Sequence, residues 1–179
     1  MKVVLIIFGS FLIKSSIALE YNFGSCPKVK PIESESIGNF TGKWYDVWKY
    51  TSMFMKSKCM RMDIEATSDS TVSITTTEVK NGQVITGTRE GEIESNGAVE
   101  FNFTFLKLKV KFYILGTDFE HYLVAYACKS VAKMANVQMA WIWSRTPELQ
   151  SKYLEKAFEV LYHNGISTDE LVPSEQEKC

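Results

Sequence analysis

Asn39-Phe40-Thr41-Gly42-Lys43-Trp44-Tyr45-Asp46-Val47-Trp48 places a glycine two residues before a tryptophan at the start of an expected strand. Glycine lets the backbone approach a buried ring closely, and an indole can close the narrow end of a small barrel. Two later stretches strengthen this interpretation. Thr117-Asp118-Phe119 precedes a strand ending at Cys128, and Trp141-Ile142-Trp143-Ser144-Arg145-Thr146-Pro147 leads from a strand into a helix.

The pattern of apolar and polar residues predicts strands along most of the chain, because the two types alternate with a period of two. Turn residues such as Asn81-Gly82 and Asn96-Gly97 separate the strands. No helical segment interrupts them, which favours an antiparallel meander, and eight such strands can close around side chains or one small ligand. The expected strands are residues 42–50, 60–67, 71–79, 83–93, 98–106, 109–116, 120–128 and 136–145.

The period changes after the last of these strands. Thr146 can cap a helix and Pro147 can take its first position, while Asn164-Gly165 is a stop signal. Glu170-Leu171-Val172 can add a short edge strand. The predicted fold class is therefore all-β, an eight-stranded up-and-down antiparallel barrel with one C-terminal α-helix packed outside. The apolar stripe that faces the barrel is Leu149, Leu154, Ala157, Phe158 and Leu161.

The first residues resemble a secretory leader. Lys2 precedes an apolar run of about 11 residues and then small residues, a pattern that predicts a signal peptide cut after Ala18. A membrane anchor is the alternative, but the run is shorter than the roughly 20 residues that cross a bilayer. We therefore expect a leader at 1–18, one domain at 19–179, secretion to the extracellular space and no stable membrane insertion.

The charge balance excludes a basic interaction surface. The chain has 20 Lys and Arg against 21 Asp and Glu, and loss of Lys2 and Lys14 with the leader leaves a net charge of about −3. This indicates no nucleic-acid partner. His121 and His163 have no obvious partners in the sequence, and phosphate loops, metal-ligand spacings and catalytic triads are missing. We expect no enzyme activity, no catalytic residue and no metal site.

Four cysteines follow the leader, and an even number in an oxidising compartment predicts two disulfides. Their spacing leaves all three pairings open. A structural role is favoured over a reactive thiol or a zinc site, since no CxxC motif or histidine cluster is present. The four residues are Cys26, Cys59, Cys128 and Cys179.

Asn39 and Asn102 begin two glycosylation sequons. A glycan must face water, so an outward Asn102 would point Phe101, Phe103 and Phe105 into the barrel. These rings are then either filled core or one wall of a ligand site.

The order of these motifs resembles that of the lipocalins. The similarity covers the whole chain after the leader and extends to the apolipoprotein D-like and insect bilin-binding (insecticyanin-type) members. It implies bridges Cys26–Cys128 and Cys59–Cys179. It also implies that Arg145 lies over the Trp44 ring as a structural cation–π pair at the closed end, where Gly42 and Asp118 also serve structure.

The resemblance and the strand parity together predict a ligand-binding face. Trp141 matches a tryptophan that lines the pocket in the family, and Met139 and Val137 share its parity. In the strand 109–116, Phe112 faces inward and Lys111 outward. Thr76 and Glu78 supply polar groups near the mouth. Comparison with the family places Arg89 toward the cavity, but its segment is two residues longer than the equivalent in the insect pigment binders, so its register, and the alternative of a solvated surface position, stay open.

These features predict a secreted carrier that holds a small hydrophobic molecule in the barrel. No cofactor is expected beyond a bound lipid or bilin as ligand. The ligand is a lipid, fatty acid or sterol; the alternatives are a biliverdin-type pigment, or a filled barrel in a secreted interaction protein. A thiol-dependent isomerase would need an unpaired cysteine. A receptor and an oligomeric state are not specified by the sequence.

Overall fold

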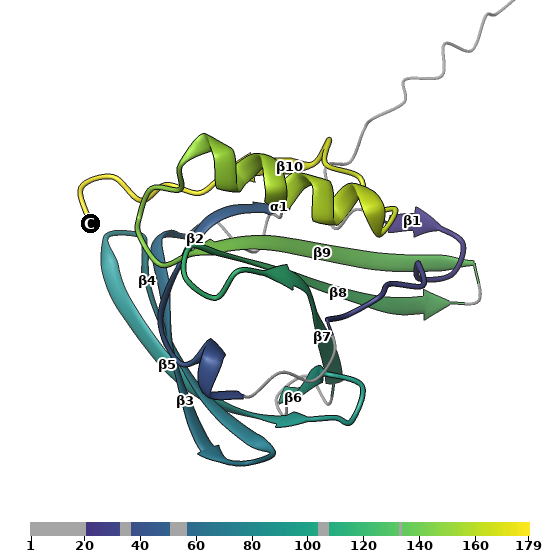
Figure 1. Cartoon of the computed structure of the whole chain (residues 1–179), viewed down its shortest axis with the longest axis horizontal. Helices are drawn as coiled ribbons and strands as arrows, with labels where there is room; N and C mark the ends of the chain where they lie inside the picture. Colours follow the sequence, from purple (N-terminus) through teal and green to yellow (C-terminus); the bar gives the residue numbers. More distant parts are fainter. Residues whose placement is uncertain (1–20, 33–36, 51–56, 104–107, 133) are drawn as a thin grey trace, which may run out of the picture.

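The computed structural model describes residues 21–32, 37–50, 57–103, 108–132 and 134–179. Eight consecutive antiparallel strands follow one another around a barrel, and the last pairs with the first to close it (Figure 1). The predicted all-β barrel is confirmed. The strands are β2 (Gly42–Tyr50), β3 (Lys58–Ser68), β4 (Thr71–Lys80), β5 (Gln83–Ile93), β6 (Ala98–Phe103), β7 (Leu108–Thr117), β8 (Tyr122–Ala132) and β9 (Ala135–Ser144).

Three short elements flank the barrel. The strand β1 (Tyr21–Phe23) pairs with β9, and the 3₁₀ helix η1 (Ile37–Phe40) directly precedes β2. Near the C-terminus, β10 (Leu171–Pro173) pairs with β2, which confirms the expected extra strand. The sequence analysis missed β1, since three residues are too few to show an alternating pattern.

The helix α1 (Ser151–His163) packs against the outside of the barrel, over β7 and β8 (Figure 1). Its predicted start at Thr146 and Pro147 is wrong, because Gln150 occupies the cap position. The Thr146 hydroxyl instead donates to the Glu148 carbonyl at 2.6 Å, which completes a local turn. A Cβ at Gly116 would lie 2.7 Å from Val160, so this glycine permits the close packing of helix on strand.

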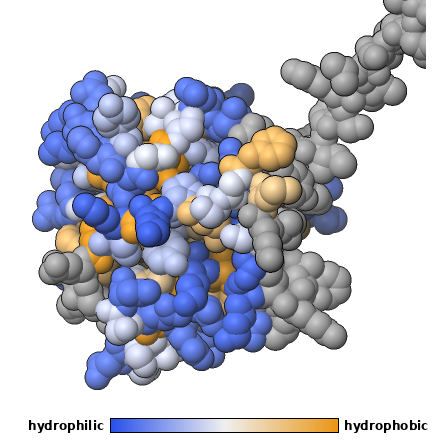
Figure 2. Space-filling view, turned by 90° about the vertical axis from the view of Figure 1, so that its right-hand side faces the viewer, coloured by the Kyte–Doolittle hydropathy of each residue, from blue (hydrophilic) through white to orange (hydrophobic). Residues whose placement is uncertain are grey.

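Alternation along the strands produces two apolar clusters, one on each side of the sheet. On β8, Val124 and Tyr126 point outward beneath α1, while Leu123, Ala125 and Ala127 point inward. Side chains that face water are largely polar, and Figure 2 shows one mainly hydrophilic side of the molecule with apolar residues interspersed among the polar ones. Within the described residues, no helix has the length and apolar character needed to span a membrane.

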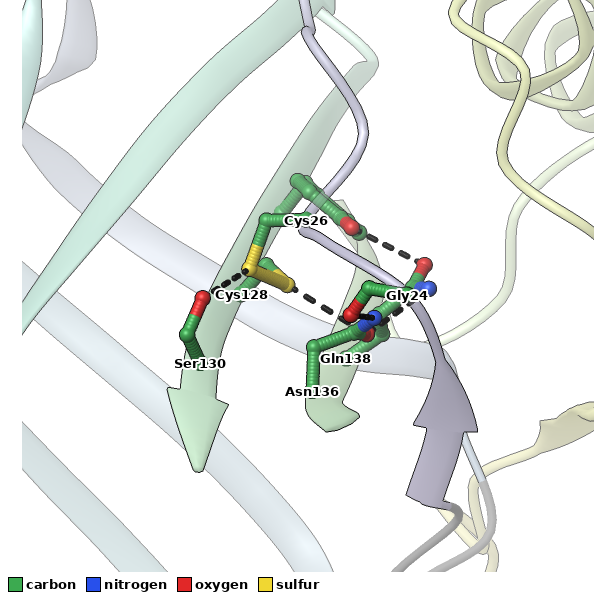
Figure 3. The surroundings of a disulfide bond; sticks show 7 residues. Gly24, Cys26, Cys128, Ser130, Asn136 and Gln138 are labelled. Carbon is green, nitrogen blue, oxygen red and sulfur yellow. Dashed lines mark hydrogen bonds between the residues drawn. A yellow bond between two sulfur atoms is a disulfide. The ribbon is translucent and has the colours of Figure 1, made fainter. Parts of the chain in front are cut away.

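Two disulfides join the terminal segments to the barrel wall. Cys26 is bonded to Cys128 on β8, and Cys59 on β3 is bonded to Cys179. The pairing implied by the family resemblance is thereby confirmed. Beside the first bridge, Asn136 donates to the Gly24 carbonyl at 3.0 Å and fixes the N-terminal segment on β9 (Figure 3).

The C-terminal segment completes the wall between β2 and β3. These strands pair only from Gly42 to Tyr45 on β2, and beyond that point β10 pairs with β2 instead. The side-chain amide of Gln176 donates to the carbonyls of Asp46 at 2.8 Å and Met60 at 2.7 Å, so it bridges the two diverging strands. The backbone amide of Cys59 on β3 also donates to the Glu175 carbonyl of this segment, at 2.8 Å.

Candidate functional site

The end of the barrel where β2 begins is sealed by an indole beneath a guanidinium. The Trp44 ring is fully buried, and the Arg145 guanidinium carbon lies 3.8 Å from its centroid. Arg145 also donates to backbone carbonyls at 2.8 to 3.2 Å, and the indole N–H of Trp44 donates to the Phe40 carbonyl at 2.9 Å. Burial lowers the pKa of Arg145, but a guanidinium remains charged at neutral pH. The predicted cation–π contact is confirmed. The carbonyls that accept from Arg145 belong to Asn39, Thr41, Lys43 and Phe119.

Gly42 serves this closed end for a different reason from the one that the sequence suggested. Its φ is +93°, a left-handed conformation that other residues adopt only with strain. A Cβ here would lie 3.3 Å from the Arg145 guanidinium. Gly42 therefore makes room for Arg145 rather than for the indole of Trp44.

Asp118 organises the turn between β7 and β8, as predicted. Its carboxylate accepts from the backbone amides of Glu120, His121 and Tyr122 at 2.7 to 3.2 Å. Although burial acts to raise the pKa of this carboxyl, the hydrogen bonds from the His121 and Tyr122 amides and from the His121 ring outweigh it, and the pKa is lowered. The expectation that His121 lacks partners is wrong, because its ring contacts Asp118 at 2.9 Å and the Tyr153 hydroxyl of α1 at 2.9 Å.

An aromatic cluster covers the inner wall of the barrel. Phe101 on β6 contacts Phe112 edge to face with centroids 5.3 Å apart, and Phe112 stacks on Trp141 at 5.4 Å. Phe112 and Trp141 belong to β7 and β9, which flank β8. Their rings can meet across β8 because the residues of β8 that pair with them, Ala127 and Ala125, have the smallest inward side chains of that strand. These alanines were missed, although their period-two spacing at inward positions was a readable signal.

Polar residues predicted near the mouth lie on the same inner face. Thr76 and Glu78 follow the inward Val72 and Ile74 along β4 at a spacing of two. Arg89 on β5 pairs directly with Ile74, so its Cβ shares that inner face. The register that the sequence left uncertain is thus defined.

The inward residues of the barrel differ in how far they are buried. Near the sealed end, Trp44 and Leu123 are buried, whereas Phe112 and Met139 retain accessible surface although they face inward. Part of the surface of these two inward side chains is therefore accessible. Val137 continues the inward row of β9 and is buried.

Two charged residues that the sequence analysis did not single out lie in the same wall. Asp46 and Lys49 are 0% and 6% exposed, and their ion pair measures 2.9 Å. The register sets Asp46 opposite Trp143 and Lys49 opposite Trp141 on β9, so both face inward. Burial raises the pKa of Asp46, and the charge of Lys49 partly offsets the rise.

The remaining predicted residues have mixed outcomes. Asn39 and Asn102 are exposed, which agrees with the inward direction of Phe101, while glycosylation itself stays a prediction. Phe105 and the side chain of Phe103 lie outside the described part of the chain, as do the leader 1–18 and the segment 51–56. Among the described residues, no group of three His, Cys, Asp or Glu is arranged to bind a metal.

Comparison with known proteins identifies the fold and the family. Residues 41–178 match the model of the Lipocalin / cytosolic fatty-acid binding protein family. Apolipoprotein D of Mus musculus is 23% identical over 163 residues, covering 89% of this chain and 86% of the relative. The bilin-binding protein of Pieris brassicae is 29% identical over 150 residues, covering 77% and 76% of the two chains.

A solved structure shows the same architecture. Insecticyanin from the tobacco hornworm Manduca sexta superposes with a TM-score of 0.72 at 22% identity, over 88% of this chain and 89% of its own. The likeness of the three sequence motifs to the lipocalins is confirmed. With its closed eight-stranded barrel, outer helix, sealed end and matching family model, this chain belongs to the lipocalin / cytosolic fatty-acid binding protein family.

Proposed function

We propose that this protein is a secreted carrier that binds a small hydrophobic molecule inside the barrel. The observation that supports this best is the cluster of Phe101, Phe112 and Trp141, whose rings contact one another on the inner wall of the barrel. Phe112 keeps part of its surface accessible there. Burial of apolar surface contributes about 25 cal/mol per Å², so an aromatic interior favours transfer of an apolar ligand out of water. Apolipoproteins and a bilin-binding protein among the relatives agree with this role.

Binding rather than catalysis is what we propose for this interior. All four cysteines are joined in the two bridges, so the thiol-dependent reaction considered from the sequence has no free sulfhydryl to use. The two disulfides also fit an oxidising, extracellular compartment.

A matched pair of phenylalanine variants tests the carrier function. Phe112 lies inside the barrel, whereas Phe158 packs outside it, against Trp48 at a centroid distance of 5.4 Å. Phe112→Ala is expected to weaken binding of the neutral dye N-phenyl-naphthylamine about tenfold, since it removes ring contacts worth about 1 to 2 kcal/mol. The dissociation constant is measured by the fluorescence of the dye.

Phe158→Ala is the control and is expected to change the dye affinity less than twofold. Absence of dye binding by the wild-type protein, or an equal loss in both variants, would contradict a ligand site in the barrel and favour a filled core. Native mass spectrometry of protein from its source, searching for a retained small molecule, identifies the natural ligand.

A bilin pigment is the second candidate ligand. Arg89 lies on the inner face of β5, where a cationic group can meet the propionates of a bilin. Titration with biliverdin is then expected to produce a shifted visible absorption band, and Arg89→Gln to weaken biliverdin about tenfold but N-phenyl-naphthylamine less than twofold. An unshifted pigment spectrum, or equal effects on both compounds, argues against this candidate.

A further inference from the structure

We propose that Asp46, Lys49 and Trp143 form a polar subsite in the inner wall that binds the hydroxyl group of an amphipathic alcohol. This inference rests on the proposed carrier function and specifies the class of its ligand. The subsite lies between the sealed end at Trp44 and the aromatic cluster at Trp141, along the two paired strands β2 and β9. An alcohol would therefore enter with its polar end first.

The first support is a set of unused hydrogen-bonding atoms. Asp46 Oδ2 accepts from Ser174 at 3.0 Å and contacts Lys49 Nζ at 2.9 Å, but Asp46 Oδ1 has no partner. Lys49 Nζ has no hydrogen-bond partner beyond this ion contact, and Trp143 Nε1 has none. All three atoms are buried, and buried polar groups in proteins are nearly always hydrogen-bonded.

The second support is the local arrangement, which combines an acceptor with donors. Asp46 and Trp143 are directly paired across β2 and β9, so the free carboxylate oxygen and the indole N–H belong to neighbouring side chains. Ser174, delivered by the C-terminal segment, fixes the other oxygen of the same carboxylate. The free atoms are thus held by packing and by the disulfide-linked tail rather than by a mobile loop.

This combination selects among ligand groups. A hydroxyl can both donate, as Asp46 Oδ1 requires, and accept, as Trp143 Nε1 requires, so its chemistry matches both atoms. A carboxylate can only accept, and it would approach Asp46 with like charge while the charge of Lys49 is already balanced. An ether accepts but cannot donate, and an alkane leaves every atom unpartnered. Since the atoms are closed to solvent, we expect the Trp143 indole to shift when the subsite fills.

The test compares dodecanol, dodecyl methyl ether, sodium dodecanoate and dodecane by displacement of N-phenyl-naphthylamine. Wild-type protein is expected to bind dodecanol about tenfold more tightly than the ether or dodecanoate. Trp143→Phe removes the N–H and keeps an aromatic ring. It is expected to lower the preference for dodecanol over dodecane about three- to tenfold, because one hydrogen bond is lost.

Trp48→Phe is the matched control, because Trp48 lies outside the barrel against Phe158. It is expected to leave the preference for dodecanol within twofold of the wild-type value. Equal binding of all four probes, or an unchanged preference in Trp143→Phe, would overturn the subsite and indicate that internal water satisfies these atoms. If no probe displaces the dye although the dye binds, the alcohol subsite fails alone; if the dye does not bind, the carrier function fails with it.

Discussion

Lys49→Met is expected to lower the free energy of unfolding by about 3 to 5 kcal/mol at neutral pH, because it leaves the Asp46 carboxylate charged, buried and without its cation. Methionine keeps the length and apolar character of the lysine side chain, so packing changes little. Chemical denaturation followed by tryptophan fluorescence measures the loss. The double variant Asp46→Asn with Lys49→Met is expected to recover most of it, since no buried charge remains.

Lys58→Met is the matched control for this prediction. Lys58 pairs with Glu175 at 3.3 Å, but the two side chains are 44% and 62% exposed. Exposed pairs contribute about 0 to 1 kcal/mol, so this variant should be nearly as stable as the wild type. Equal losses in Lys49→Met and Lys58→Met would show that burial of the Asp46 pair has no energetic consequence.

The loss in Lys49→Met should also depend on pH. Burial raises the folded pKa of Asp46 above its unfolded value, and removal of Lys49 raises it further. A raised folded pKa means that the folded protein holds the proton more tightly, so stability declines as pH rises through that pKa. The deficit should therefore be large at neutral pH, shrink as the pH falls below the raised folded pKa, and be smallest below about pH 4, where the carboxyl is protonated in both states. A deficit that is constant with pH would contradict an origin in the Asp46 charge.

Replacing both Cys59 and Cys179 by serine is expected to lower the free energy of unfolding by about 4 to 5 kcal/mol. The two residues are 120 positions apart, and in the chain-entropy model a bridge that closes a loop of about 100 residues contributes about 4.7 kcal/mol. Urea denaturation of the two oxidised proteins measures the difference.

A second readout separates this bridge from the other one. Without Cys59–Cys179, hydrogen exchange should accelerate at the backbone amide of position 59, which is bonded to the Glu175 carbonyl, and at the Ser174 amide, which is bonded to the Val47 carbonyl. The variant lacking Cys26 and Cys128, whose bridge spans 102 positions, should lose similar stability but leave both amides protected. Identical exchange patterns in the two variants would contradict a specific role of the C-terminal bridge in closing the wall.

Local patterns predicted the parts of this protein that depend on neighbours in sequence. Alternation with period two places Phe101, Phe112 and Trp141 on one face, and the stop signal at Asn164-Gly165 ends α1 where expected. The helix start was misplaced because the Thr146 hydroxyl bonds to Glu148 within a turn, which competes with capping. The composition of the motif does not show whether the Thr146 hydroxyl caps a helix or bonds to the Glu148 carbonyl within a turn.

The candidate site was predicted only in part for a related reason. The aromatic wall and Arg89 follow from strand parity and family likeness, but Asp46 and Lys49 resemble ordinary surface charges in the sequence. Asp46 keeps the parity of the inward Trp44, but Lys49 turns inward only because a register irregularity between Asp46 and Trp48 breaks the simple alternation of β2. His121 gained Tyr153 as a partner only because α1 packs beside the turn.

The sequence by itself determined the strand succession, the inward and outward faces of most strands and the number of bridges, because each depends on local periodicity or residue chemistry. The sealed end was implied by the family resemblance. The tertiary structure decided that the C-terminal segment lies between β2 and β3, that Ser174 meets Asp46, and that a charged pair is buried beside two tryptophans. Those features join residues more than 90 positions apart, and only closure of the barrel brings such residues side by side.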